Sequence, residues 1–594
     1  IRPRDWSSDV CSSDLQVLDR TVTPLGARLL ETRLREPWRD PGSIGRCLDA
    51  VEHFFREDGV RQALRQALDQ IHDLERLSTR VQLGRATPRD FAALRQSLSA
   101  LPQARAALSG ENPPADLRTM LESWDDMGDL AATLSAALVD SPPLAVTEGG
   151  LFRLGYQPEL DDLIQLTEHG EARVRELFEQ ERAASGIPKL KLGFNRVFGY
   201  YFEVSKAHQG PVPETFIRRQ TLVNCERYVT PRLKELEDRL LSASEERKAL
   251  EYKLFQELRQ VLAQARARFV YMAGVLAGLD YWQGLAEAAR LHDWTRPEVH
   301  EGLEIIVESG RHPVVEAAQG AANYVPNDVR LDEERRILLI TGPNMAGKST
   351  VLRQTAVLTL MAQIGSFVPA RRARIGLADR IFSRVGASDN LAQGQSTFMV
   401  EMMETARILR QATRRSLVIL DEIGRGTSTF DGLALAWAVV EDLSRRAGGV
   451  RTLFATHYHE LTSLEGRIPG LRNLNIAVRE WKGDIVFLRR LVPGPADKSY
   501  GIEVARLAGV PRPVVERARE ILAKLEEKSQ NERAQGAPRC SRPHLPGLET
   551  AGTTPAAAES PLVSALRELD VDGLTPIQAL TLLHQWKQML KDGQ

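Results

Sequence analysis

A phosphate-binding loop is the clearest chemical signal in the sequence. Gly342, Gly347, Lys348 and Ser349 satisfy the pattern G-x-x-x-x-G-K-[ST], after the apolar run ILLIT and before the helical stretch TVLRQTAVLTLMAQ. Glycines allow backbone N–H groups to turn toward phosphates, and the N-terminus of the following helix adds partial positive charge. In such a loop Lys348 reaches the terminal phosphates and the Ser349 hydroxyl ligates Mg²⁺. The loop predicts that the chain binds a nucleotide with Mg²⁺.

Two carboxylates end a second apolar run and extend the predicted site. In SLVILDEIGRGTSTFDG, Asp421 is placed to hold the Mg²⁺ shell, and Glu422 is placed to orient or deprotonate the attacking water. A third apolar run, RTLFAT, leads into Thr456 and His457, whose imidazole is placed to contact the terminal phosphate. A lone histidine beside a strand is more often structural, so this role depends on the other two motifs.

These motifs need a sheet to bring them together, and the sequence supplies one. After about Arg296 strand-like runs alternate with helical segments, which is typical of an α/β domain. The strand-like runs are LEIIV, RILLIT, SLVILD and RTLFAT. From about Gln16 to Gly150, by contrast, leucine and alanine recur at three- and four-residue spacing. We therefore expect an all-helical unit followed by an α/β unit.

Two long helices are expected between these units, packed side by side as a lever. The first lies in PELDDLIQLTEHGEARVRELFEQERAASG, and its partner begins near Pro231. Steps of three and four along the partner predict a heptad-like seam, interrupted by Arg247 and Glu257. The members of this seam are Leu233, Leu236, Leu240, Ala243, Leu250, Leu254 and Val261.

A small basic sheet is expected at the tip of this lever. The period changes to two in KLKLGFNRVFGYYFEVSK, where Asn195 and Arg196 are placed for a turn between two strands. Residues 189–234 include nine Lys and Arg residues and only three Glu residues, and aromatic residues are interleaved with these charges. The charges either form a solvated face over a small aromatic core or grip a nucleic-acid backbone. In the second interpretation the contacts come from Lys189, Lys191, Arg196, Arg218 and Arg219.

The composition of the whole chain excludes several classes of protein. The 594 residues carry 78 Lys and Arg against 79 Asp and Glu, so any basic surface must be local. The four cysteines are far apart and form no CxxC pair, which argues against zinc and against a disulfide framework. Because no apolar run reaches a membrane-spanning length, we expect a soluble, unexported protein of a reducing cytoplasm. The first fifteen residues, IRPRDWSSDVCSSDL, are interpreted either as a disordered native leader or as a foreign joint to a truncated gene.

Four motifs in this order resemble the MutS family of DNA mismatch repair ATPases, a branch of the ABC-type nucleotide-binding fold. They are TGPNMAGKST, GQSTFMVEM, LDEIGRGTSTFDG and FATHYHEL. The resemblance extends through LDRTVTPLGARLL, KLGFNRVFGYYFEVSK, RRQTLVNCERYVTP and ADKSYGIEVARLAGVP, and so covers nearly the whole chain after the leader. STFMVEM and GRGTS are far more specific than a phosphate-binding loop alone.

The resemblance implies further site residues and partners. In such ATPases two protomers face each other, and Ser396 corresponds to a serine that completes the partner's phosphate site. Asn344 matches a phosphate-binding residue, Tyr324 and Val325 fall where the family holds adenine, and Ala346 stands where many relatives have glycine. The loop implied to hold ATP is completed by Pro343, Met345 and Thr350. The implied ligands are ATP, Mg²⁺ and double-stranded DNA. The implied protein partners are a second copy of the chain, with tetramers forming through the C-terminal helices, a MutL-type repair partner and the replication sliding clamp. The implied location is the bacterial cytoplasm, in association with the nucleoid.

The expected architecture is multidomain, with an all-α core and lever helices, a β-rich clamp insert, an α/β ABC-type ATPase domain and a short helical C-terminus. The boundaries are a leader at 1–15, the core and first lever helix at 16–170, the clamp insert at 171–234, the returning lever and core at 235–296, the ATPase domain at 297–528, a linker at 529–560 and a helical dimerisation or partner unit at 561–594. The basic tip matches the family's DNA clamp.

The sequence leaves other functions open beside a mismatch repair ATPase. The family's mismatch-reading domain, with its Phe-x-Glu element, and its connector would lie before residue 16, so this chain is expected to keep the ATPase and clamp parts without that reader. A MutS-like clamp naturally lacking the reader, acting on recombination junctions or other nucleic-acid structures, is the first alternative. An ABC ATPase of a transporter is the second, and the absence of apolar spans in the sequence disfavours it.

Overall fold

The computed structural model describes residues 17–110, 113–195, 199–208, 210–343, 346–385, 397–481, 484–496 and 500–534. The chain divides into two compact units, residues 1–510 and 511–594. Within the second unit the described element is the helix α18, Arg512–Ala534. The leader and the predicted C-terminal helices lie outside the described residues.

A bundle of short helices forms the first part of the larger unit, as the three- and four-residue spacing predicts. Several of these helices begin with an oxygen-bearing N-cap followed by proline, which supplies the hydrogen bonds that the first turn lacks. Thr23, Asp40 and Thr87 have this role. The helices are α2 (Pro24–Arg35), α3 (Pro41–Arg56), α4 (Asp58–Leu68), α5 (Leu74–Gln82), α6 (Pro88–Ala107), α7 (Ala115–Glu122) and α8 (Gly128–Ala137), followed by the 3₁₀ turn η1 (Val146–Glu148).

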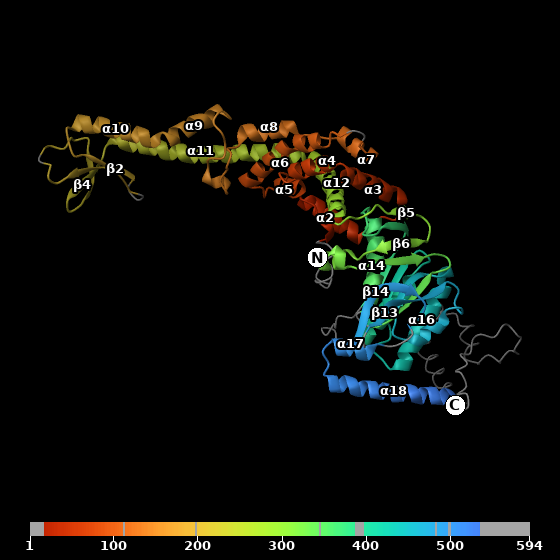
Figure 1. Cartoon of the computed structure of the whole chain (residues 1–594). Helices are drawn as coiled ribbons and strands as arrows, with labels where there is room; N and C mark the ends of the chain where they lie inside the picture. The colour runs from red at the N-terminus through yellow and green to blue at the C-terminus, as the bar shows by residue number, and fades with distance from the viewer. Residues whose placement is uncertain are drawn as a thin grey trace, which may run out of the picture. The chain divides into compact units, whose positions relative to one another are not determined.

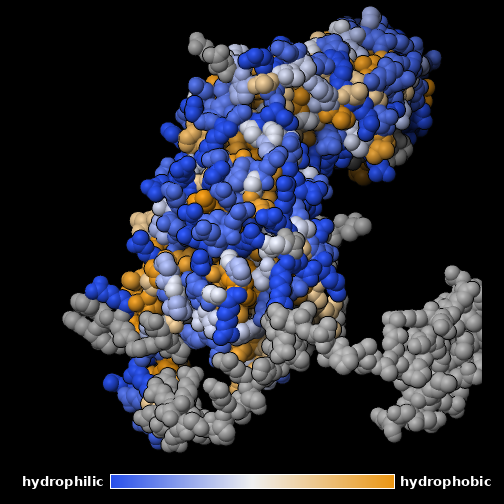
Figure 2. Space-filling view, turned by 90° about the vertical axis from the view of Figure 1, so that its right-hand side faces the viewer, coloured by the Kyte–Doolittle hydropathy of each residue, from blue (hydrophilic) through white to orange (hydrophobic). Residues whose placement is uncertain are grey.

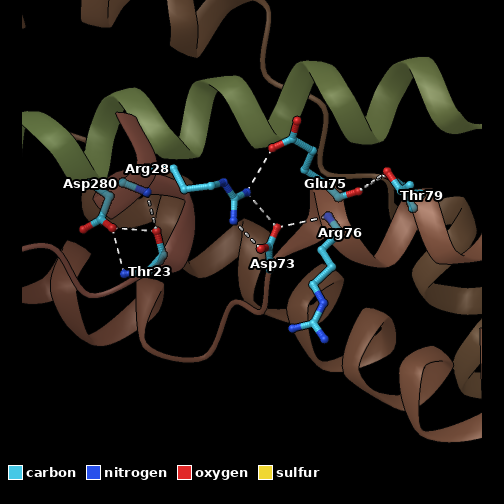
Figure 3. Close-up of polar contacts among 9 residues, drawn as sticks. Thr23, Arg28, Asp73, Glu75, Arg76, Thr79 and Asp280 are labelled. Carbon is cyan, nitrogen blue, oxygen red and sulfur yellow. Dashed lines mark hydrogen bonds and ion pairs between the residues drawn. The ribbon is translucent and has the colours of Figure 1, made fainter. Parts of the chain in front are cut away.

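A buried carboxylate ties the start of this bundle to a later helix. Asp280, on α12 (Arg266–Leu291), accepts hydrogen bonds from the backbone N–H of Val22 at 3.0 Å and of Thr23 at 2.8 Å, and from the Thr23 hydroxyl at 2.6 Å (Figure 3). Arg28 on α2 also forms ion pairs with Asp73 and Glu75 at the start of α5 (Figure 3). Burial raises the pKa of Asp280, and its hydrogen bonds oppose that rise.

The predicted lever is present as two helical arms that lie side by side (Figure 1). One arm is α9 (Pro158–Glu168) followed by α10 (Gly170–Ser185), and the other is the 34-residue helix α11 (Pro231–Gln264). Helix α12 continues from α11 after the single residue Ala265.

The predicted seam is correct near the start of α11 and wrong near its end. Leu233, Ala243 and Leu254 are buried, but Val261 is 44% exposed. Phe255, Leu258 and Leu262 are buried instead, because this half of α11 also packs against the core helix α5.

A four-stranded antiparallel sheet lies beyond the arms, with the order β1-β2-β4-β3. Its strands are β1 (Lys191–Asn195), β2 (Gly199–Ser205), β3 (Ile217–Thr221) and β4 (Cys225–Val229). Asn195 is the last residue of β1, and Arg196, which we expected in the turn, lies outside the described residues. Phe202, Phe216 and Tyr228 form a small core that packs on the lever residue Leu233. The change of period in the sequence therefore predicted this sheet correctly.

The rest of the larger unit is an α/β region built on two sheets. The six-stranded sheet has the order β10-β11-β12-β8-β13-β14, and its first five strands are parallel. The other has the order β5-β9-β6-β7. The four predicted strand runs correspond to β6, β8, β11 and β12. The strands are β5 (Glu298–His300), β6 (Ile305–Gly310), β7 (Asn327–Leu331), β8 (Ile337–Thr341), β9 (Arg372–Gly376), β10 (Ile381–Arg384), β11 (Leu417–Asp421), β12 (Arg451–Ala455), β13 (Leu471–Trp481) and β14 (Asp484–Pro493).

Helices and 3₁₀ turns connect these strands. They are α13 (Pro313–Gln319), η2 (Ala321–Asn323), α14 (Lys348–Gln363), α15 (Thr397–Gln411), α16 (Thr429–Arg445), η4 (Arg446–Gly448), η5 (His459–Leu464) and α17 (Gly501–Leu507).

The C-terminal end of α14 is fixed to the helical bundle by several hydrogen bonds. The Gln363 side chain donates to the Trp38 carbonyl at 2.9 Å, and the Trp38 N–H donates to the Gln363 carbonyl at 3.1 Å. The Tyr281 hydroxyl on α12 donates to the Ile364 carbonyl. One end of α14 therefore contacts the bundle while the other end begins at the phosphate-binding loop.

Hydrophilic residues cover most of the face shown in Figure 2, with smaller hydrophobic groups between them. Among the described residues, no helix combines the length and the apolar character needed to cross a membrane.

Candidate functional site

Parallel pairing brings the three sequence motifs to one edge of the six-stranded sheet. Asp421, the last residue of β11, pairs with Ala455 on β12, and Ala455 pairs in turn with Ile340 on β8. Because these strands run in the same direction, the residues after each of them emerge at the same edge. The loop after β8, the carboxylates after β11 and His457 after β12 therefore meet there.

The phosphate-binding loop has the backbone geometry that its glycines allow. Gly342 has φ 132° and Gly347 has φ 109°, values that disfavour residues with a side chain. Ala346 is buried and is not among the residues with positive φ, so its methyl group creates no backbone strain there. Pro343 is buried, whereas Asn344 and Met345 lie outside the described residues.

Lys348 is the first residue of α14 and is only 4% exposed. Its ammonium group donates to the carbonyl of Gly342 and, at 3.1 Å, to that of Pro343. Burial lowers the pKa of Lys348 to about 8, although the nearby carboxylates of Glu422 and Asp421 raise it in part. A buried ammonium held at the mouth of this loop is positioned to meet a phosphate.

Asp421 and Ser349 fit the binding of a divalent cation. Burial raises the pKa of Asp421, while a hydrogen bond from the Ser349 hydroxyl lowers it in part. Within the described part of the chain, Oδ1 of Asp421 is buried without a hydrogen-bond partner. A buried carboxylate oxygen lacking a donor, beside a hydroxyl, provides the oxygen ligands that Mg²⁺ prefers. Thr350 follows Ser349 in the first turn of α14.

Glu422 is held in an unusual backbone conformation by its neighbours. Its φ is 59°, and its N–H donates to the Ala455 carbonyl at 2.9 Å. Its carboxylate contacts His457 Nε2 and forms an ion pair with Arg425 at 2.6 Å. Burial raises the pKa of Glu422, but the hydrogen bond and charge of His457, together with Arg425 and Lys348, outweigh burial and lower it. The carboxylate is therefore ionised at neutral pH, as a water-activating base requires.

A pocket of about 390 Å³ opens beside these carboxylates. Its lining residues come from α14, the end of β10, the N-terminal part of α15 and the loop that follows β11. The residues that line it are Arg353, Arg384, Val385, Thr397, Glu401, Asp421, Glu422, Arg425 and Gly426.

Tyr324 packs against the helix that follows the phosphate-binding loop. Its hydroxyl donates to Oε1 of Gln354 at 3.1 Å, and Gln354 is a fully buried residue of α14. Burial raises the pKa of Tyr324. Val325, the next residue, is half-buried. An aromatic ring held here is suitable for stacking on a base.

The basic tip contains exposed and ion-paired cations. Lys189, Lys191 and Arg219 are exposed, and Arg218 is exposed but forms an ion pair with Glu226 at 3.3 Å. Arg227, by contrast, lies over the Tyr201 ring at 4.2 Å. Arg196 and the predicted trans-acting Ser396 lie outside the described residues.

Several residues near the site had not been singled out from the sequence. Arg425 lies within the GRGTS motif, three residues after Glu422, and that spacing could have suggested the ion pair. Glu401, on helix α15, lies within the STFMVEM motif, and that motif was the signal that could have pointed to it, whereas Arg384, on strand β10, lies outside all four motifs. Only the fold shows that both residues line the pocket.

Comparisons with known proteins show which family the chain resembles. Family models described as MutS domain III, MutS domain V and DNA mismatch repair protein MutS C-terminal region match residues 9–286, 338–526 and 554–589. A DNA mismatch repair protein MutS from Nitratidesulfovibrio vulgaris (strain DP4) is 63% identical, over 96% of this chain and 66% of the relative. Proteins with the same name from Oleidesulfovibrio alaskensis and Symbiobacterium thermophilum are 60% and 48% identical, over 97% and 98% of this chain and 67% and 66% of the relatives. The chain thus spans about 66% of the length of the first of these relatives.

Proposed function

The chain belongs to the MutS family of DNA mismatch repair proteins, and from that premise we propose that it is an ATPase that clamps duplex DNA as a dimer. The observation that carries the proposal is the meeting of Lys348, Asp421 and Glu422 at one edge of a parallel sheet. The match to MutS domain V over residues 338–526 includes all three residues.

In the proposed reaction the loop residues 342–350 bind the phosphates of ATP, and Tyr324 with Val325 holds the adenine. Lys348 exchanges its bonds to loop carbonyls for bonds to phosphate oxygens. Ser349 and Asp421 would hold Mg²⁺, and the ion would supply positive charge to the phosphates during hydrolysis.

Glu422 orients the attacking water and accepts its proton, and the contact between its carboxylate and His457 positions the base. His457 is also proposed to contact the terminal phosphate. The ionised state of Glu422 supports its role, because only a carboxylate can accept the proton.

A second copy of the chain is proposed to face the nucleotide pocket and to contribute Ser396. Exposed apolar side chains on α15 and α16, helices that contact each other, support an interface there. Met403 is 50% exposed and Phe430 is 83% exposed. Apolar residues of this size are stabilised when a partner covers them.

The tip sheet is proposed to hold the DNA backbone through its exposed cations Lys189, Lys191, Arg218 and Arg219. Arg196, which lies outside the described residues, is proposed as a further contact. Movement at the nucleotide is proposed to reach the tip through α14, whose far end is bonded to the bundle that continues into α12 and α11. ATP and DNA would then each change the affinity for the other.

The test measures hydrolysis and binding separately in Glu422→Gln. This substitution should reduce single-turnover ATP hydrolysis at least about a hundredfold while the Kd for ATP with Mg²⁺ changes by less than about threefold. Lys348→Ala, the comparison variant, should lose ATP binding itself. Hydrolysis by Glu422→Gln at the parent rate would remove Glu422 from the proposed role.

A further inference from the structure

Gly424, two residues after Glu422, has both its backbone N–H and its backbone carbonyl in hydrogen bonds to other segments. Its N–H donates to Oε1 of Glu401 at 2.5 Å, and its carbonyl accepts a hydrogen bond from the Tyr458 hydroxyl at 3.0 Å. The backbone of this one residue therefore connects the loop after β11 to α15 through its N–H and to the segment after β12 through its carbonyl.

Close packing adds to these two hydrogen bonds. Gly424 has φ 91°, and a Cβ atom there would lie 2.7 Å from Cα of Gly432 in α16. No residue with a side chain fits this backbone position. The path of the loop is thus set by Gly424, while Glu422 keeps its left-handed φ of 59° within the same loop.

Glu401 is itself anchored and borders the pocket beside Asp421 and Glu422. It is 6% exposed, and its Oε2 lies 3.8 Å from Nη2 of Arg384, the buried last residue of β10. Arg384 also forms an ion pair with Glu404 at 2.9 Å. Glu401 and Arg384 both line the pocket that contains Asp421 and Glu422. A buried carboxylate has a desolvation cost, which here is offset by an arginine and a backbone N–H.

We propose that Glu401 is a positioning residue for hydrolysis: by accepting the Gly424 N–H, it fixes the loop that aims the Glu422 carboxylate at the attacking water. The inference rests on the proposed role of Glu422. Glu401 is not proposed to contact ATP. The residues proposed to bind the phosphates lie between β8 and the start of α14, whereas Glu401 lies on α15 and contacts the loop after β11.

Removing the Glu401 carboxylate leaves the Gly424 N–H and the Arg384 guanidinium without that acceptor. The loop can then leave its left-handed conformation, and the Glu422 carboxylate is displaced from its productive position. A displacement of about 1 Å is enough to slow a positioned reaction about a hundredfold. Lys348, Ser349 and the glycines of the phosphate-binding loop, Gly342 and Gly347, are unaffected, so ATP binding persists.

The experiment compares Glu401→Ala and Glu401→Gln with Glu404→Ala in the full chain. Glu404 is the matched control because it pairs with Arg384 but makes no contact with Gly424. Single-turnover hydrolysis of bound ATP and the Kd for ATP with Mg²⁺ are measured on each variant, with thermal unfolding as the check of folding.

Glu401→Ala should hydrolyse bound ATP about 10- to 100-fold more slowly with its Kd for ATP changed by less than about twofold. Glu401→Gln keeps a neutral acceptor and loses the charge, so it should fall between Glu401→Ala and the parent, about three- to tenfold slow. Glu404→Ala should match the parent. The ordering of the three variants, with the rate alone affected, distinguishes positioning from general destabilisation, which would weaken ATP binding as well.

Parent rates in both Glu401 variants would overturn the inference, and so would a loss of ATP affinity as large as the loss of rate. If Glu401→Ala does not fold, Glu401→Gln decides, and a parent rate there overturns the inference. Glu422→Gln measured in parallel separates the two ideas. An inactive Glu422→Gln beside unaffected Glu401 variants rejects only the positioning role, whereas an active Glu422→Gln rejects the proposed function of that site.

Discussion

The affinity for ATP should depend on pH through Lys348. Burial lowers the pKa of this ammonium to about 8 in the protein without nucleotide. Phosphate oxygens in contact with it favour the charged form, so the pKa must rise again when ATP binds. Binding above pH 8 therefore requires uptake of a proton, and the affinity must fall as the pH increases.

The size of the effect follows from the fraction of protonated lysine. With a pKa of about 8, roughly nine-tenths of the Lys348 side chains are charged at pH 7 and roughly one-tenth at pH 9. If the ATP complex stays protonated throughout, the Kd for ATP rises about tenfold between these two pH values, which corresponds to about 1.4 kcal/mol.

The assay is equilibrium titration with a fluorescent ATP analogue and Mg²⁺ at pH 7, 8 and 9, at constant ionic strength. Lys348→Arg is the control, because a guanidinium stays charged over this range. Its binding should be weaker than that of the parent but independent of pH. A parent Kd that changes by less than about twofold from pH 7 to pH 9 would refute the argument that a buried, partly neutral Lys348 grips the phosphates.

Three further predictions concern the metal site, the tip and the bundle. Asp421→Asn should abolish the increase in ATP affinity that Mg²⁺ produces while leaving metal-free binding nearly unchanged. ATP titrations with Mg²⁺ and with EDTA measure this, and the same Mg²⁺ dependence in the variant and the parent would contradict it. Lys191→Ala combined with Arg219→Ala should weaken duplex binding and reduce the slope of log K against log salt by about two, whereas Arg371→Ala, outside the tip, should change neither; an unchanged slope in the double variant would exclude the two cations as phosphate contacts. Asp280→Ala should lower the free energy of unfolding by about 3 kcal/mol, because two backbone N–H groups and a buried hydroxyl lose their acceptor. Denaturant titration measures this, with Asp69→Ala as an exposed control, and a stability of Asp280→Ala equal to that of the parent would contradict it.

Local patterns in the sequence predicted the elements and the motifs, because periodicity and glycine spacing reflect local geometry. The β8 run and the GKS triplet predicted a strand, a loop and a helix that the structure contains. The period-two stretch from Lys189 predicted the tip strands.

Contacts between distant segments could not be predicted in this way. Val261 fitted the heptad spacing but is exposed, since α11 changes packing partners along its length. Glu251 is an acidic residue and yet is fully buried, because it forms an ion pair with Arg247 at 3.1 Å and accepts a hydrogen bond from the N–H of Leu151. Glu401 reaches Gly424 across 23 residues of sequence, and no spacing rule connects two such positions.

The most direct test of the account measures each ligand's effect on the other. Duplex DNA affinity is determined with and without ATP and Mg²⁺, and ATP affinity is determined with and without the duplex, using Glu422→Gln to prevent turnover. Because linkage is reciprocal, the account predicts that ATP changes the Kd for DNA by some factor well above one and that DNA changes the Kd for ATP by that same factor. If each ligand binds and neither changes the affinity for the other, the nucleotide site and the tip are not coupled, and the central claim is wrong.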